Sequence, residues 1–161
     1  MNPQAQQFIR LMRHPLHSRL FMLLKLPAAY FSGVRIRQLT PERAVVSVPY
    51  KWFSQNPFRS TYFACLAMAA EMSTGLLALM QLYKRKPAVS MLVVKLEAHY
   101  FKKATGLTSF VCEAGADFER IVDECIRTGA PLTYVATAVG RNEADELVAE
   151  FFITWSFKAK V

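Results

Sequence analysis

The sequence predicts an α+β fold in which a curved antiparallel sheet wraps one long central helix. Residues 60–83 are apolar almost throughout, and Glu71 is their only charged residue. Residues 89–103 and 146–158 alternate apolar and polar side chains, which is typical of long, half-buried antiparallel strands. A helix that is hydrophobic nearly all round has to be buried, and strands with one apolar face provide the surface that buries it.

The central apolar stretch carries its one acid on a face of small residues. At about 100° per residue, this face consists of Ala64, Ala67, Glu71, Thr74, Gly75 and Ala78. Small neighbours allow another group to approach the Glu71 carboxylate. The length of the stretch also permits a membrane span, but an acid at mid-depth costs roughly 2.5 to 3.5 kcal/mol on insertion scales. We therefore expect a buried helix of a soluble domain.

Composition and charge narrow the class of protein. The 161 residues, 53% apolar and 20% charged, fit one globular domain. The net charge of +8 favours an anionic partner, for which a nucleic acid, a membrane surface and the phosphates of coenzyme A all qualify. The basic residues are dispersed and no zinc-finger or RNA-binding motif is present, so we expect no nucleic-acid partner.

The three cysteines indicate a reducing compartment. Cys65, Cys112 and Cys125 are too few and too far apart for a disulfide framework or a Cys-x-x-Cys metal site. We therefore expect a cytoplasmic protein that binds no metal.

The N-terminal part of the chain has a different pattern from the rest, so we divide the chain into an N-terminal helical extension, residues 1–31, and a main domain, residues 32–161. Residues 1–7 are polar and are expected to fray. The remainder of the extension is basic and amphipathic, and Lys25 interrupts an apolar run that would otherwise mimic a signal peptide. Two interpretations stay open: helices that pack on the domain, which we favour, or a basic anchor on a membrane surface.

Strand patterns cover most of the main domain. Besides the two long strands, β-branched or alternating residues predict four shorter ones, at residues 34–39, 44–48, 107–113 and 132–141. Strict alternation along the long strand 89–103 predicts one apolar face made of Leu92, Val94, Leu96, Ala98 and Tyr100.

Helix boundaries follow from capping residues. Asn56-Pro57 combines a good N-cap with a residue suited to the first helical turn, so we expect the central helix to begin within residues 57–61. A second, amphipathic helix is expected at residues 117–128, with Asp117 as its cap and Gly129 as its stop.

The order of these elements and three short segments resemble a hotdog-fold branch of thioesterase-like proteins. The segments are Asn56-Pro-Phe-Arg-Ser-Thr-Tyr-Phe-Ala, Glu71-Met-Ser-Thr-Gly and Phe152-Ile-Thr-Trp-Ser-Phe-Lys, and the resemblance covers about residues 34–158. Acyl-CoA thioesterases of this fold carry an Asn before the helix, a His-Gly-Gly at its start and an acid further along. Asn56 and Glu71 match the outer two elements, whereas Tyr62-Phe63-Ala64 stands in place of His-Gly-Gly.

The resemblance implies an acyl-CoA thioesterase that hydrolyses an acyl or aryl thioester. Glu71 would act as base or nucleophile, and Asn56 would orient water or the carbonyl. The substrate-binding residues that the resemblance implies are Ser73, Thr74, Arg59, Ser60, Tyr62 and Phe63. Coenzyme A would enter as part of the substrate and no other cofactor is expected. The family also implies a homodimer or a dimer of dimers.

Each of these roles has a structural alternative. Glu71 could form an ion pair across a dimer interface, and Asn56 could act as an N-cap alone. The missing His-Gly-Gly leaves open a non-catalytic hotdog module that binds an acyl ligand without turnover.

Overall fold

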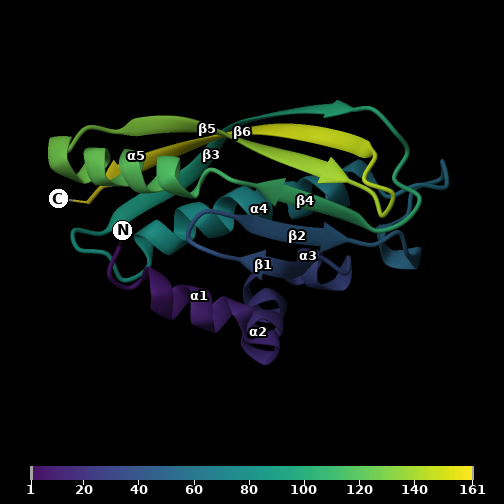
Figure 1. Cartoon of the computed structure of the whole chain (residues 1–161), viewed down its shortest axis with the longest axis horizontal. Helices are drawn as coiled ribbons and strands as arrows, with labels where there is room; N and C mark the ends of the chain where they lie inside the picture. Colours follow the sequence, from purple (N-terminus) through teal and green to yellow (C-terminus); the bar gives the residue numbers. More distant parts are fainter. Residues whose placement is uncertain (1, 161) are drawn as a thin grey trace.

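The computed structural model describes residues 2–160 and is built around one antiparallel sheet of six strands. Figure 1 shows the sheet curving around the long helix α4. This arrangement confirms the predicted α+β fold and the hotdog architecture. Over the described residues, the elements are α1 (Ala5–Arg13), α2 (Pro15–Lys25), α3 (Pro27–Phe31), β1 (Arg35–Leu39), β2 (Ala44–Val48), the short 3-10 helix η1 (Trp52–Ser54), α4 (Phe63–Leu82), β3 (Val89–Tyr100), β4 (Thr108–Cys112), α5 (Gly115–Thr128), β5 (Leu132–Arg141) and β6 (Leu147–Ala159).

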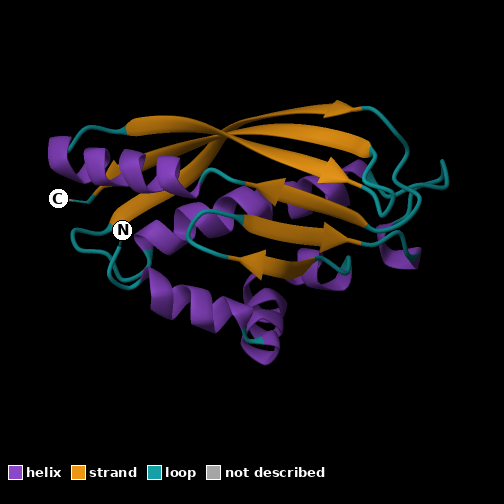
Figure 2. Cartoon of the chain, in the orientation of Figure 1, coloured by secondary structure: helices purple, strands orange, loops and turns teal. Residues whose placement is uncertain are grey.

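The strand order gives the sheet two different edges. The order is β1-β2-β4-β5-β6-β3, so β1 and β3 are the edge strands. Helices α1 to α3 lie on the β1 side of the molecule, and β3 lies on the opposite side (Figure 2). An uncovered edge strand offers unpaired backbone groups to another strand, so the β3 edge is open to a partner.

The central helix α4 is buried as predicted. Large and small side chains on several of its sides pack into the core, among them Leu66, Ala70, Leu77, Ala78 and Met80, each at most 4% exposed. The helix is long and apolar enough to cross a membrane, but 67% of its most apolar 18-residue window is buried inside the domain. The chain is therefore a soluble globular domain with one buried apolar helix.

The start of α4 was predicted too early. The helix begins at Phe63, not within residues 57–61. Residues 57–60 form a turn that the isolated β-bridge between Gln55 and Thr61 closes. One contact distant in sequence holds the end of this turn away from the helix: the Thr61 backbone N–H donates to the Ala104 carbonyl at 2.8 Å. Asn56 is therefore a loop residue and does not cap the helix.

A buried hydrogen bond joins α4 to the sheet. The Trp155 indole Nε1 of β6 donates to Thr74 Oγ1 at 3.0 Å, and the same hydroxyl donates to the Glu71 carbonyl at 2.9 Å. Thr74 is fully buried and Trp155 is 3% exposed. The bond fixes the rotation of α4 against the strand, because a buried indole N–H needs a partner.

The helix α5 extends the core and corrects a predicted cap. Its first residue is Gly115, its N-cap is Ala114, and no side chain caps it; Asp117 lies instead in the first turn. Only glycine fits at its start, because a Cβ on Gly115 would lie 2.0 Å from the Pro41 carbonyl oxygen. Gly129, with φ of 69°, ends the helix as predicted.

The strand β3 departs from strict alternation. A bulge between Val93 and Lys95 shifts its register, so that Leu92 lies opposite Ser156 whereas Leu96 lies opposite Ile153. Directly opposed residues share a face of the sheet, so Leu92 and Leu96 lie on different faces. The predicted single apolar face of this strand is therefore wrong, and both faces of β3 present apolar side chains.

The N-terminal segment packs firmly on the domain. Phe8, Ile9 and Met12 of α1 are at most 4% exposed and belong to the core. The prediction that residues 1–7 fray is wrong within the described part, because the Asn2 side chain is buried and its Nδ2 donates to the carbonyls of Met80, Gln81 and Tyr83 at 3.1, 3.2 and 2.8 Å. These are carbonyls at the C-terminus of α4 that lack helical partners. The domain boundary at residue 31 stays a prediction.

Replacing Thr74 with Val should lower the free energy of unfolding by about 1 to 3 kcal/mol, because the isosteric side chain leaves the buried Trp155 N–H without an acceptor. Urea denaturation measures this value. Thr74→Ser keeps a hydroxyl and should lose less. Equal stability of the Val variant and the native protein would mean that the bond makes no net contribution.

Candidate functional site

The loop before α4 is folded around the side chain of Asn56. Its Oδ1 accepts hydrogen bonds from the Phe58 backbone N–H at 2.9 Å, and from the backbone N–H and the hydroxyl of Ser60, both at 3.2 Å. Its Nδ2 donates to the Thr61 carbonyl at 3.4 Å. The Asn56 side chain is thus engaged in shaping the loop, and Asp or Ala in its place would lose part of this network.

A groove of about 770 Å³ lies between this loop, the start of α4 and the segment after β3. It brings together four of the predicted residues, Asn56, Ser60, Tyr62 and Phe63. Five further lining residues were not among the predicted site residues. The apolar or aromatic ones are Leu66, Tyr100 and Phe101, and the cations are Lys102 and Lys103. An apolar groove with cations at its rim suits a ligand that has an apolar body and an anionic end.

Arg59 lies outside this groove. It lines a neighbouring cavity of about 450 Å³ together with Tyr50 and Gln55, and its φ of 58° is in the left-handed region. Lys103, by contrast, lines the groove, and its Nζ donates to the Phe58 carbonyl at 3.3 Å. Lys102 pairs with Glu146 at 2.5 Å.

Glu71 lies on the same helix but does not line the groove, which extends along α4 as far as Leu66. Eight residues separate it from Phe63, which corresponds to roughly 12 Å along the axis of α4. Its carboxylate lies against Gly75, where an added Cβ would be 3.3 Å from Glu71 Oε1 and also 3.3 Å from the Trp155 ring. Within one chain, Glu71 therefore does not line the groove that Asn56 lines.

The Glu71 carboxylate has an unusual environment. It is partly buried and makes no hydrogen bond or ion pair within residues 2–160. Burial raises the pKa of this carboxyl above its ordinary value of 4.5. An acid that is desolvated and has no cationic partner is a better proton acceptor than an exposed one.

The hydroxyls of Ser73 and Thr74 are engaged in the core. Ser73 Oγ donates to the Ala70 carbonyl at 2.7 Å, and Thr74 contacts Glu71 through the backbone carbonyl and not through the carboxylate. Both side chains are fully buried. Their predicted substrate contacts have no support from this geometry.

The face of α4 that carries Glu71 is the one the chain leaves partly open. The residues of this face, all partly buried, are Ala64, Ala67, Met68, Glu71 and Gly75. The Trp155 ring beside Glu71 and Gly75 belongs to β6, whose neighbour is the edge strand β3. On the helix-facing side of the sheet, Leu96 and Tyr100 of β3 lie opposite Ile153 and Ala149 of β6, yet they are 44% and 48% exposed. Glu71 therefore borders an apolar surface near the β3 edge that the single chain does not cover.

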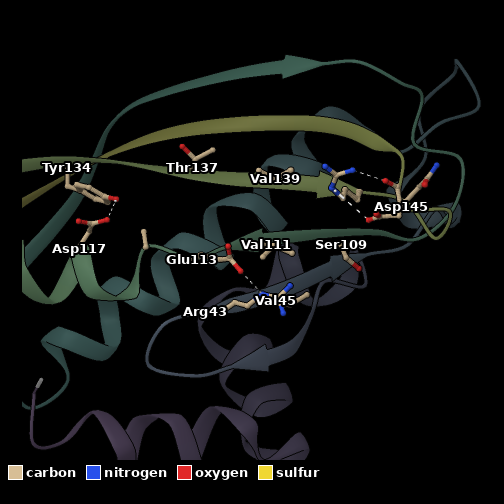
Figure 3. A pocket seen from close by; sticks show the side chains of 13 residues that line it. Arg43, Val45, Ser109, Val111, Glu113, Asp117, Tyr134, Thr137, Val139 and Asp145 are labelled. Atoms are coloured by element: carbon tan, nitrogen blue, oxygen red, sulfur yellow. Dashed lines mark hydrogen bonds and ion pairs between the residues drawn. The ribbon is translucent and has the colours of Figure 1, made fainter.

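A second groove, of about 720 Å³, runs along β2, β4 and β5 (Figure 3). Its charged groups pair with one another: Arg43 with Glu113 at 3.2 Å, and Asp117 with the Tyr134 hydroxyl at 3.0 Å. Burial and the bond to Asp117 raise the pKa of Tyr134 to about 12. These charges satisfy each other, so we assign no chemistry to this groove.

No group of His, Cys, Asp and Glu within the described residues could hold a metal ion. The three cysteines are buried free thiols. Burial raises the pKa of Cys112 to about 11, which keeps it protonated and unreactive at neutral pH.

Solved structures of similar architecture support the fold. A protein of unknown function from Pseudomonas aeruginosa, described as a probable thioesterase, has a TM-score of 0.76 and 20% identity over 93% of this chain and 99% of its own. A protein of unknown function from Chlorobaculum tepidum has a TM-score of 0.76 and 16% identity, covering 91% and 97%. A thioesterase from Haemophilus influenzae has a TM-score of 0.62 and 13% identity, covering 87% and 88%.

The sequence comparison identifies a family whose function is unassigned. No curated protein matches this chain. Residues 17–157, which include the whole hotdog core and most of α2, match the model of DUF4442, a domain of unknown function. The chain therefore belongs to the DUF4442 family.

Proposed function

We propose that this protein is an acyl-CoA thioesterase in which Glu71 activates water or attacks the thioester. The observation that carries the proposal is the Glu71 carboxylate: it is partly buried, unpaired within residues 2–160, and open toward an uncovered apolar surface. The raised pKa of Glu71 suits a general base near neutral pH. Structures of the same fold that are described as thioesterases add support.

The proposed reaction uses Glu71 in one of two ways. As a base, it takes a proton from water while the water oxygen attacks the carbonyl carbon, and the coenzyme A thiolate leaves. As a nucleophile, its carboxylate attacks the carbonyl carbon and the C–S bond breaks, so that the coenzyme A thiolate leaves and a mixed anhydride remains, which water then hydrolyses. In the first turn of α4, the N–H groups of Cys65 and Leu66 already donate to the Tyr62 carbonyl. The N–H groups of Phe63 and Ala64 have no helical acceptor and are the ones suited to stabilise the oxyanion.

Two copies of the chain would complete this site. A thioester carbonyl has to lie within hydrogen-bond reach of both the oxyanion donors and the base or its water. Because Glu71 lies roughly 12 Å along α4 from its start, one chain cannot supply both groups to one carbonyl. We therefore propose that the groove of one copy and Glu71 of another form the site.

The β3 edge suits the proposed dimer contact. The strand is 12 residues long, and its exposed apolar residues, 44–65% exposed, are Leu92, Val94 and Leu96. Such an edge, left open, is a template for strand pairing. Pairing of two β3 strands would also cover the apolar surface beside Glu71.

The groove offers a place for both ends of the substrate. Tyr62, Phe63 and Phe101 provide apolar contact for an acyl or aryl group, and Lys102 and Lys103 at the rim are suited to the phosphates of coenzyme A. We place the protein in the cytoplasm, where three free thiols stay reduced.

The second candidate is a non-catalytic module that binds an acyl ligand. The observation that favours it lies at the start of α4, where the rings of Tyr62 and Phe63 lie 4.8 Å apart at the position of the His-Gly-Gly of related thioesterases. These rings occupy space next to the amides that would stabilise the oxyanion.

Turnover of an acyl-CoA panel, from short to long chains and aryl groups, separates the two candidates. Wild-type protein should hydrolyse at least one member, and Glu71→Gln should lower kcat by at least about 100-fold, as expected for loss of a general base. Free thiol release measures the rate. Glu124→Gln, the same change at a partly buried position on α5 whose side chain is 44% exposed, should leave the rate unchanged. A folded wild-type protein without turnover that still binds acyl-CoA would favour the binding module.

The proposed dimer predicts the effect of a charge at the β3 edge. Leu96→Lys should convert a dimer to monomers and abolish turnover, since the edge could no longer pair and the site would be incomplete. Light scattering after size-exclusion chromatography gives the molar mass. Val135→Lys, at a 53% exposed position on β5, is the matched control and should stay dimeric. A native protein that is monomeric and active would contradict the shared site.

The pKa of Glu71 predicts a pH dependence of stability. Because the folded state raises this pKa above 4.5, it binds the proton more tightly than the unfolded state. The contribution of the group to stability is therefore fully present below pH 4.5 and is lost as the pH rises through the folded pKa. Each pKa unit by which the folded state exceeds the unfolded state corresponds to about 1.4 kcal/mol of folding free energy.

Glu71→Gln should accordingly be more stable than the native protein at pH 7, and the two should converge at pH 4. Thermal denaturation at both pH values measures the difference. A Gln variant that is less stable at pH 7 would mean that Glu71 forms an ion pair across the interface between two copies.

A further inference from the structure

The helix α2 presents an apolar stripe to solvent. Leucines at helical spacing on one of its sides are 39–69% exposed, namely Leu16, Leu20, Leu23 and Leu24. The other side holds Met22, which is 1% exposed and belongs to the core. The outer stripe is therefore not needed to hold α2 on the domain, and no other element within residues 2–160 covers it.

An aromatic cluster lies at the end of α3, the helix that follows α2. Phe31 ends α3, its ring lies 5.9 Å from that of Phe53, and the Phe53 ring lies 6.0 Å from that of Trp52. Leu26, between α2 and α3, is 38% exposed and connects the stripe to these rings along the chain. Trp52 is 80% exposed. Exposed Trp and Phe beside a leucine stripe are typical of surfaces that enter the interfacial region of a bilayer.

Cations border this apolar surface without acids among them. A groove of about 490 Å³ between α1, α2 and β1 is lined by Arg13, Arg19, Arg35 and Arg37 and by no acidic residue. Arg35 donates to the Val34 carbonyl at 2.7 Å, and Arg37 to Ser47 Oγ at 2.6 Å. Arg13 and Arg19 are exposed and form no hydrogen bond or ion pair with the rest of the described chain.

The charge along the chain makes the same face strongly basic. The first acid in the sequence is Glu42, whereas six Lys and Arg residues precede it. Anionic lipid attracts such a segment with about 1 kcal/mol per cation near the surface. A protein partner with a matching apolar groove would not require this absence of acids.

We propose that α2, the Trp52–Phe53 turn and the arginine-lined groove dock this protein on an anionic lipid bilayer. The exposed leucines and Trp52 enter the interfacial layer, and Arg13 and Arg19 contact headgroup phosphates. The face lies on the β1 side of the molecule, away from the β3 edge (Figure 1), so docking and pairing of β3 edges are compatible. The proposal does not depend on thioesterase activity.

Vesicle binding tests the proposal in the full-length protein. Co-sedimentation with phosphatidylcholine vesicles containing phosphatidylglycerol should be saturable, weaker at high salt and weak with phosphatidylcholine alone. Leu20→Gln/Leu24→Gln should weaken binding at least about tenfold through lost apolar burial. Arg13→Gln/Arg19→Gln should weaken it roughly thirtyfold. Val135→Gln, an exposed apolar position on the sheet, is the control and should bind like the native protein.

Intrinsic fluorescence reports where the lipid contacts the protein. The chain has two tryptophans, and Trp155 is buried at 3% exposure, so a blue shift on adding vesicles reports Trp52. Trp52→Phe should remove the shift. Circular dichroism melting shows that each variant is folded.

Three results would overturn the proposal. The first is no binding to anionic vesicles at low salt. The second is binding that the leucine and arginine variants leave unchanged. The third is a loss of self-association in the leucine variant, which would assign the stripe to a contact between copies of the chain.

Discussion

The whole structure depends on the need to bury a helix that is apolar on nearly every side. Strands with one apolar face can cover such a helix on only part of its circumference, so α1 and α5 pack around the remainder. The Asn2 side chain donates hydrogen bonds to the carbonyls at the C-terminus of the helix. The Trp155–Thr74 hydrogen bond then selects one rotation of the helix against the sheet. Hydrophobic burial alone does not select it, because an apolar helix buries similar area in many orientations.

That rotation leaves one stripe of α4 uncovered, and Glu71 lies on it. A carboxylate at a fully buried position of this helix, such as Ala70 or Leu77, would be enclosed at a far greater desolvation cost. On the open stripe the cost is smaller, yet burial still raises the pKa of Glu71. The small residues Gly75 and Ala67 keep the stripe shallow enough for another molecule to approach. The fold thus buries an apolar helix and still places its one acid, Glu71, on the helical face that is only partly buried.

Local patterns predicted the elements of the fold, and long-range contacts decided their details. Helical and alternating periodicity gave α4, α5 and the strands, because these depend on side chains a few residues apart. The start of α4 depends on the bond between Thr61 and Ala104, 43 residues apart, which no local pattern contains. The bulge at Val93 depends in the same way on pairing with β6. Asn56 and Glu71 stood out as residue types, but only the start of the helix at Phe63 shows that Asn56 lies in the preceding loop and that Glu71 lies eight residues into α4.

The two sides of the molecule differ because helices flank the β1 edge of the sheet, whereas the β3 edge is open. The β1 edge and the helices that precede it form the most basic part of the chain, since four cations in α1 and α2 and two in β1 precede the first acid, Glu42. The β3 edge carries apolar residues on both faces, a consequence of its bulge. A surface that attracts anionic lipid and a surface that pairs with a copy of itself need opposite properties, since repulsion between like charges opposes self-association and favours an anionic partner. Their separation on opposite sides of one sheet makes the proposed lipid docking compatible with the proposed pairing of two copies.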